Sequence, residues 1–272
     1  MNKVTTGTLA ALLGLGAPPA LAQTADPEEE RPDTFVLNLG AFYIDDADST
    51  ISANRPAGLL GTSISLERDL DVEERVTVPR LQGYFRFNPH HRIDFSYFQY
   101  ERDGKKTIGR EIDFRDQTFD VEARVKGSLE NEVWKLAYTW SFYHTKTLEL
   151  GFTAGARVTR YEAELKTTGG AVSEKEEVKA PLPLLGLRLD YAISRNWHVL
   201  FTTESLYVEL GEDIRGSYND MRLAIEWRPI QHVHFGLGTN RFTLNARVDE
   251  PDWRGQLDNA YRGYLGYVGV RF

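Results

Sequence analysis

The chain has 272 residues, of which 41% are hydrophobic and 26% charged, and its net charge is −8. It contains no cysteine, which excludes disulfides, thiolate nucleophiles and cysteine-based metal sites. The acidic balance argues against nucleic acid as a partner. No run of about 20 apolar residues follows residue 22, so no transmembrane helix is expected there.

The first 22 residues are typical of a secretory signal peptide. Lys3 is followed by an apolar stretch, and the segment ends with Ala20 and Ala22 on either side of a leucine, as at a signal peptidase site. We therefore predict cleavage after Ala22. Residues 23–33 are rich in acidic residues and proline and have no apolar anchor, which predicts a flexible periplasmic lead-in.

From residue 34 onward the hydrophobic pattern has a period of two. In "EVWKLAYTWSFYH" the aromatic and leucine side chains of residues 134–142 share one face, and polar or small residues occupy the other. Such alternation predicts β-strands, about ten in number and antiparallel. The predicted strands are 34–44, 77–88, 91–102, 132–144, 147–164, 181–193, 197–210, 218–229, 232–248 and 257–272. Eight or twelve strands stay open as alternatives, because the segment 45–76 is long and "GTSISLERDL" is compatible with an extra strand.

The connections between these strands alternate between tight and long. Tight polar turns are expected at 88–91, 144–147, 194–197 and 229–232. Longer polar segments lie at 45–76, 101–131, 165–180, 211–218 and 249–256. Short turns at one end and long loops at the other are typical of a transmembrane β-barrel. Aromatic residues cluster beside the tight turns, as in the girdle at a membrane interface, which a soluble sandwich does not require. The sequence therefore predicts an all-β protein in which residues 34–272 form a closed antiparallel transmembrane barrel.

The C-terminal segment "YRGYLGYVGVRF" ends in an alternating apolar face. Tyr264, Val268, Val270 and Phe272 lie on that face, and we expect this last strand to pair with the first, because an unpaired edge in a membrane is very costly. The terminal phenylalanine resembles the C-terminal signal of Gram-negative outer-membrane β-barrel proteins, although Tyr267 stands where many members have glycine. The resemblance implies location in the outer membrane, insertion by the barrel-assembly machinery, and contact with outer-membrane lipid and lipopolysaccharide. We expect a monomer.

The opposite face of the strands carries charges of both signs. The residues predicted to face the lumen are Arg80, Arg86, Asp94, Glu149, Arg157, Arg188, Asp190, Asp220, Arg222 and Glu226, with Arg228 beside them. A barrel of eight to ten strands is narrow enough for side chains to fill. We therefore predict a network of ion pairs that blocks the lumen, since a lone buried charge is costly. A narrow ion path and a ligand or catalytic site remain as alternatives.

Two further motifs have a functional and a structural interpretation. All six histidines lie at or beside the tight turns, where decoration of the rim is favoured over a metal site: His90, His91, His144, His198, His232 and His234. The acidic run "DDADST" (45–50) lacks the glycine and the distal glutamate of a calcium loop, so a solvated loop is favoured. No metal and no cofactor are expected.

The enzymes known on this scaffold provide the alternative function. Outer-membrane lipid A deacylases use a His and a Ser on one strand, and no His-x-Ser occurs here. Omptin proteases use Asp and His at the extracellular rim, where no histidine is expected. Ser141 and His144 are predicted to point to opposite faces, which disfavours a phospholipase. We predict a non-catalytic barrel with a structural or small-pore role; the alternative is a surface enzyme acting on lipid or peptide.

Overall fold

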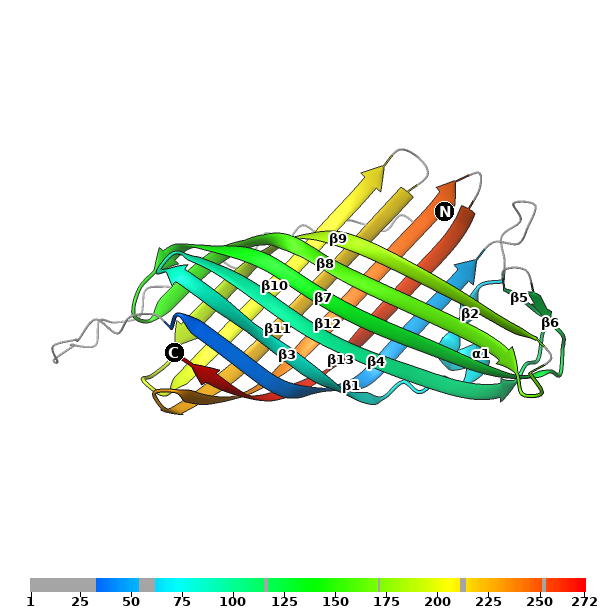
Figure 1. Ribbon diagram of the computed structural model, residues 1–272, viewed down its shortest axis with the longest axis horizontal. Helices are drawn as coiled ribbons and strands as arrows, with labels where there is room; N and C mark the ends of the chain where they lie inside the picture. Colours follow the sequence, from blue (N-terminus) through cyan, green and yellow to red (C-terminus); the bar gives the residue numbers. More distant parts are fainter. Residues whose placement is uncertain (1–32, 54–61, 115–116, 171, 211–213, 251–252) are drawn as a thin grey trace, which may run out of the picture. The chain divides into compact units, whose positions relative to one another are not determined.

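The protein forms an antiparallel barrel in a computed structural model that describes residues 33–53, 62–114, 117–170, 172–210, 214–250 and 253–272. Within these ranges ten long strands neighbour one another in chain order (Figure 1). They are β1 (Phe35–Ala53), β3 (Val76–Asn88), β4 (His91–Thr107), β7 (Arg124–His144), β8 (Leu148–Thr167), β9 (Ser173–Ala192), β10 (Trp197–Leu210), β11 (Ile214–Ile230), β12 (Val233–Glu250) and β13 (Trp253–Arg271). The prediction of ten strands is confirmed.

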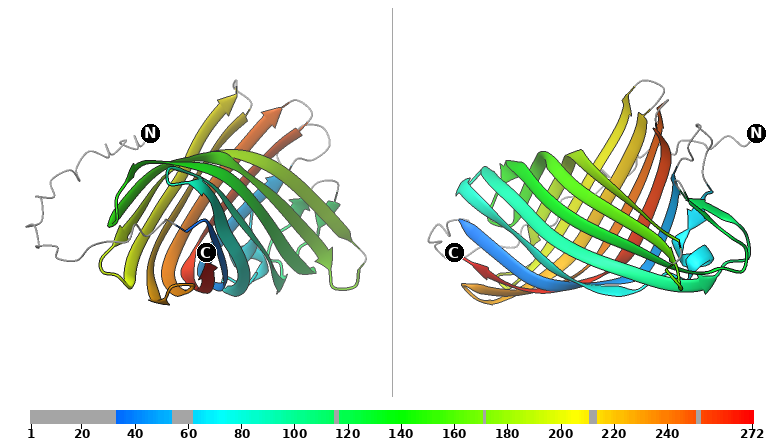
Figure 2. Two further views of the ribbon diagram at one scale, coloured as in Figure 1. Left: turned by 60° about the vertical axis from the view of Figure 1, so that its left-hand side comes forward. Right: turned by 45° about the vertical axis from the view of Figure 1, so that its right-hand side comes forward.

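The last strand closes the barrel against the first. The pairing of β1 with β13 is continuous from Val36 opposite Arg271 to Ala53 opposite Gly255, apart from one bulge. Phe272 extends this ladder, because its N–H donates to the carbonyl of Phe35 at 2.9 Å. In Figure 2 the red end of β13 lies beside the blue start of β1. The predicted closure is therefore confirmed, and no long sheet edge is left between these strands.

Most strands extend further at the long-loop end than the sequence indicated, although β10 ends at Leu210 as predicted, so part of each predicted long loop is strand. The polar residues of these segments continue the hydrogen-bonded pairing of the strands, because that pairing uses backbone groups and not side chains. The segment "GTSISLERDL" holds the short strand β2 (Ile64–Ser65) and the helix α1 (Leu66–Leu70). A small hairpin, β5 (Ile112–Phe114) with β6 (Gln117–Phe119), lies between β4 and β7. Among the described residues, no helix is both long and apolar enough to cross a membrane.

The outer surface of the barrel carries a band of exposed apolar side chains. Every long strand contributes to it. Members include Leu39, Tyr43, Phe85, Phe87, Ile93, Trp134, Leu136, Trp140, Phe142, Phe152, Leu185, Leu187, Trp197, Leu223, Ile225, Trp227, Phe235, Leu237, Tyr264, Val268 and Phe272. Aromatic rings stack near the tight turns, with 6.4 Å between the ring centres of Trp197 and Trp227. Such a band with an aromatic girdle matches the lipid-facing surface of a membrane barrel.

This band predicts that the folded chain needs an amphiphile. Monomeric soluble proteins rarely expose contiguous apolar patches of more than a few hundred Å². In detergent the protein should show a β-type circular dichroism spectrum, and it should migrate differently on a gel before and after boiling. A monodisperse folded monomer in detergent-free buffer would contradict the assignment.

At the long-loop end the pattern inverts, and the apolar side chains point inward. On β7, Val125, Leu129 and Val133 are fully buried inside, whereas Glu130 and Glu132 lie on the outer face. This arrangement is that of a soluble sheet, whose outer face meets water. The interior therefore contains an apolar core at this end, where the sequence pattern predicted polar loops.

The acidic run 45–50 lies in β1 and begins at a bulge in that strand. The pairing with β13 shifts between Ile44 and Asp46, so that Ile44 and Ala47 both point inward. The run lies within a strand and is not a solvated loop, which corrects the prediction. One of its carboxylates, Asp46, pairs with Arg262 of β13 at 3.0 Å.

The barrel wall has a seam between β9 and β10. Their pairing ends where Leu185 lies opposite Ser205, and the two strands diverge beyond it (Figure 1). Pro181 and Pro183 lie just past this point, and proline suits an unpaired edge because it has no N–H to leave unsatisfied. The Tyr218 hydroxyl donates a hydrogen bond to the Pro183 carbonyl at 3.3 Å. This hydrogen bond gives the Pro183 carbonyl a donor beside the seam, where β10 does not provide one.

Candidate functional site

The barrel interior is the candidate functional site, and it contains all ten residues that the sequence predicted for the lumen. Arg80, Arg86, Glu149, Arg157, Arg188 and Glu226 are buried, and Asp94, Asp190, Asp220 and Arg222 are half-buried. The interior side chains divide among three levels, which we call the tight-turn layer, the aromatic layer and the mouth plug; none of the ten predicted residues belongs to the mouth plug. A cavity lies between the first two.

The tight-turn layer is built on a buried ion pair. The Arg86 guanidinium donates to both carboxylate oxygens of Glu149, at 2.8 and 2.9 Å. Ser141 donates to the same carboxylate at 2.5 Å, and Arg86 also donates to the Pro89 carbonyl at 2.7 Å. Both bonds to Glu149 come from Nη2 of Arg86, and these charge-assisted contacts hold the side chains beside the tight turns in place.

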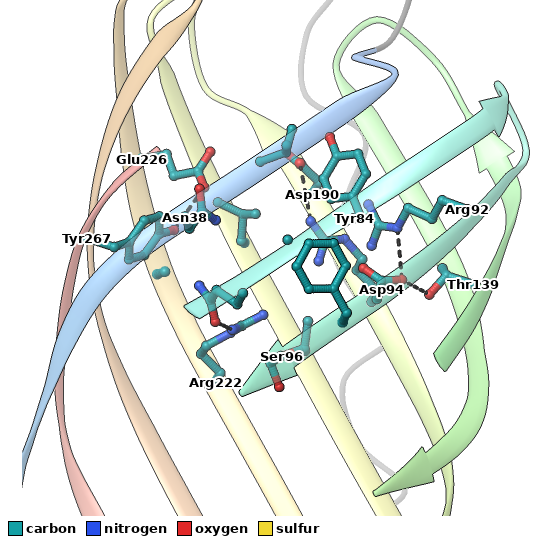
Figure 3. Close-up of a pocket in the computed structure, with 18 of the residues that line it drawn as sticks. Asn38, Tyr84, Arg92, Asp94, Ser96, Thr139, Asp190, Arg222, Glu226 and Tyr267 are labelled. Carbon is teal, nitrogen blue, oxygen red and sulfur yellow. Dashed lines mark hydrogen bonds and ion pairs between the residues drawn. The ribbon is translucent and has the colours of Figure 1, made fainter. Parts of the chain in front are cut away.

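The ring around the cavity includes a second carboxylate cluster. Glu226 accepts from Arg228 at 2.8 Å and from the Tyr267 hydroxyl at 2.8 Å. Asp190 lies 3.7 Å from Arg228 and 3.2 Å from His198. Figure 3 shows Glu226 and Tyr267 together on one side of the cavity, with Arg92 and Asp94 on the other. Tyr267, which departs from the usual glycine, is therefore an inward-pointing member of this ring; its ring covers Gly236.

Three histidines correct the prediction of rim decoration. His198 lies 3.2 Å from Asp190, and His144 lies 3.6 Å from Glu149, which Ser141 also binds; a bulge after Ser141 thus brings together two residues predicted on opposite faces. His234 is almost fully buried inside the barrel, where its Nε2 lies 2.7 Å from Asn38 Oδ1. The inward parity of β12 places it there. His232 lies at the surface and stacks on Phe272, with 5.6 Å between ring centres. The described residues contain no group of three or more His, Asp or Glu side chains arranged to hold a metal ion.

The structure also settles which charges meet. Arg188 lies 3.9 Å from Asp190 on its own strand. Arg222 reaches across the interior, as a long side chain in a narrow lumen can, but its partner is the neutral Gln82 at 2.5 Å and not Glu226. Sequence parity places these residues inside, but it cannot show which side chains meet across the lumen.

The aromatic layer spans the interior on the long-loop side of the cavity. Its rings are buried and come from six strands: Phe42, Phe98, Tyr100, Tyr161, Tyr218, Phe242 and Tyr261. Arg157 crosses this layer, with its guanidinium 4.1 Å from the centre of the Phe242 ring. It binds Asp220 at 3.0 Å and the Tyr261 hydroxyl at 3.2 Å. Stacking and charge pairing thus tie β8, β11, β12 and β13 together across the lumen.

The mouth plug fills the long-loop end and was not predicted from the sequence. Helix α1 packs inside the wall, where Gly104 and Gly127 lie directly opposite each other on β4 and β7. A Cβ on Gly104 would collide with the backbone of Asp71 and Val72, and one on Gly127 would meet the Leu70 side chain. The two glycines therefore form a flat seat for the helix end.

A buried ion pair locks this plug. Arg102, only 1% exposed, donates to Glu67 of α1 at 2.8 Å and to the Ser49 hydroxyl at 2.6 Å. It also donates to the Glu73 carbonyl at 3.1 Å. The signal in the sequence was a pair of inward-facing glycines at the end of β4 and β7 where the neighbouring inward residues, such as Arg102 and Leu129, are large.

The cavity between the tight-turn layer and the aromatic layer has a volume of about 70 Å³, which is room for a few water molecules. Replacement of Glu226 by glutamine should have a moderate effect on stability, because Glu226 borders this cavity. Arg228 would lose its carboxylate, while nearby water would offset part of the loss. We expect the free energy of unfolding to fall by about 1–3 kcal/mol. Urea unfolding in detergent measures it, with Glu209→Gln on the exposed surface as the control; equal stability of both variants would contradict the pairing.

Comparison with known proteins supports the fold. No protein-family model matches the chain, and no curated protein sequence matches it significantly. Among solved structures, the outer membrane protease OmpT from Escherichia coli matches with a TM-score of 0.60 at 9% identity, covering 87% of this chain and 97% of OmpT. The attachment invasion locus protein Ail of Yersinia pestis matches with a TM-score of 0.35 at 11% identity, covering 87% and 98%. The transport unit of the autotransporter AIDA-I from Escherichia coli gives 0.42 at 8% identity, covering 92% and 93%.

The chain thus has the closed β-barrel fold of Gram-negative outer-membrane proteins. At such low identity the likeness concerns the fold alone.

Proposed function

We propose that the chain is an integral outer-membrane barrel with a structural role and an occluded lumen. The aromatic layer is the observation that carries this proposal. Arg157 and its ring partners extend from β8 to β13, and none of them leaves its side chain open to solvent. A water-filled pore would require an open path past this level, and the mouth plug covers the same interior a second time.

Planar-bilayer recording tests this function. The purified, detergent-folded chain should insert and yet give no stable conductance steps, with insertion checked by protease protection of the barrel. A reproducible open level for the wild-type chain would favour the alternative of a small pore.

Orientation and processing belong to the same proposal. The tight turns face the periplasm and the long loops face outward, as in barrels of this fold. Residues 1–32 lie outside the described residues, so cleavage after Ala22 stays a prediction; Asp33, at the end of the predicted lead-in, binds Arg271 at 2.6 Å. Phe272, exposed at the end of the lipid-facing surface, is proposed to act as the assembly signal.

The position of the histidines bears on the enzymatic alternative. All six lie in the tight turns or at the strand ends beside them. A surface hydrolase working at the opposite mouth would need a general base other than histidine. The proposal therefore assigns no catalytic residue.

A further inference from the structure

Charge pairing inside the barrel leaves two arginines without a direct ion pair. Asp220, which Asn240 links to Arg80, is already paired with Arg157 at 3.0 Å. Five cations around the cavity and the aromatic layer each have a carboxylate partner: Arg92 with Asp94, Lys135 with Glu204, Arg157 with Asp220, Arg188 with Asp190, and Arg228 with Glu226. Arg80 and Arg222 form no ion pair with any residue that the structure describes. Their hydrogen-bond acceptors are neutral amides, Asn240 at 2.9 Å for Arg80 and Gln82 at 2.5 Å for Arg222.

These two guanidinium groups share one corner of the cavity. Asn240, which binds Arg80, lies directly opposite Arg222 in the ladder of β11 and β12. Gln82, which binds Arg222, is the next inward residue after Arg80 on β3. Both arginines line the cavity, and Arg80 is 7% exposed with a buried Nε that has no partner. The corner therefore holds two adjacent positive charges and an unsatisfied donor.

Such an arrangement is unfavourable without an anion. Like charges in a poorly solvated interior repel each other, and a buried charge requires a partner. Guanidinium groups bind phosphate, sulfate and carboxylate oxygens through paired N–H donors. The hydroxyls of Ser96 and Thr202 line the same cavity and can donate as well. We propose that Arg80 and Arg222 form a binding site for one small divalent oxyanion of the phosphate or sulfate type.

The size and lining of the cavity favour a free ion over a larger phosphorylated molecule. Asp33 and Arg271, at the tight-turn end, line the same cavity, so the ion would enter there. Two further buried donors without partners, Arg92 Nη2 and Arg188 Nε, belong to arginines that line this route. That the route opens to the periplasm rests on the proposed orientation; the binding site itself does not.

Equilibrium dialysis of the detergent-folded full chain against radiolabelled inorganic phosphate tests the site. Wild type should bind one phosphate saturably, sulfate should compete, and chloride at equal ionic strength should compete poorly. Arg222→Gln should weaken binding at least tenfold. Arg215→Gln, which removes an exposed arginine paired with Glu209, should bind as wild type does. No saturable binding by wild type, or equal binding by Arg222→Gln, would overturn the proposal.

Urea unfolding separates a binding role from a merely structural one. The wild-type midpoint should rise with phosphate concentration, as it must for a ligand of the folded state. Arg222→Gln should show no such rise, and in phosphate-free buffer it should be at least as stable as wild type, because the repulsion with Arg80 is gone. A variant that is less stable in phosphate-free buffer would show a structural role and overturn the proposal. Both experiments use detergent and no membrane, so their outcome is independent of whether the barrel conducts.

Discussion

Replacing Arg157 by alanine should lower the free energy of unfolding by roughly 3–5 kcal/mol. Arg157 is 2% exposed, and its loss leaves the Asp220 carboxylate inside the barrel without its closest cation. The Tyr261 hydroxyl loses a donor, and the Phe242 ring loses the guanidinium stacked on it. Urea unfolding of the detergent-folded protein measures the change. The same variant should still show no conductance steps, because the mouth plug covers the interior at a second level.

Two control variants separate charge from volume. Arg157→Met keeps most of the side-chain volume and loses the charge, so its loss of stability reports the missing charge pair alone. Arg215→Ala removes an exposed arginine and should change stability by less than about 1 kcal/mol. An Arg157→Ala protein as stable as Arg215→Ala would show that this arginine is not a buried cross-link.

Valine in place of Gly104 should dislodge the mouth plug. A Cβ at this position collides with the backbone of Asp71 and Val72, so α1 must move away from its seat. Overpacking of this kind costs about 1–3 kcal/mol, and the barrel strands themselves should survive it. Trypsin should then cleave after Arg68 in α1 faster than in wild type, which mass spectrometry of the fragments detects.

Gly169 offers the matched control for that experiment. It lies in the turn after β8 and has no atoms near its missing Cβ, so Gly169→Val should leave cleavage after Arg68 unchanged. Equal cleavage in Gly104→Val and Gly169→Val would mean that the glycine seat does not hold the helix.

The strands in the apolar band could be predicted from the sequence because membrane and lumen impose opposite demands on alternate residues. Residues 134–142 show this plainly, and so does the closing strand at the C-terminus. The prediction of strands failed on the long-loop side of Trp134. There water replaces lipid outside the barrel, and the apolar side chains point inward. Val133 and Trp134 are adjacent apolar residues on opposite faces. They mark the level at which the apolar side chains of β7 change from the outer to the inner face.

The partners of the inward residues could not be read from parity. Arg222 and Glu226 both point inward as predicted, yet they bind Gln82 and Arg228, since register and strand tilt decide which side chains meet across a lumen. The bulge after Ile44 hid the last part of β1, because it inverts the alternation. The plug was missed because a five-residue helix is too short to give a periodic pattern.

Thiol labelling from the long-loop side tests most directly whether the interior is filled. The natural chain has no cysteine, so a single introduced thiol is the only target. Ala163 points inward on β8 and is buried in the apolar core, whereas Thr168 is exposed just beyond the same strand. With a small charged thiol reagent, Ala163→Cys should react far more slowly than Thr168→Cys in the folded barrel, and the two should react equally in urea. Equal labelling of both in the folded state would contradict an occluded lumen.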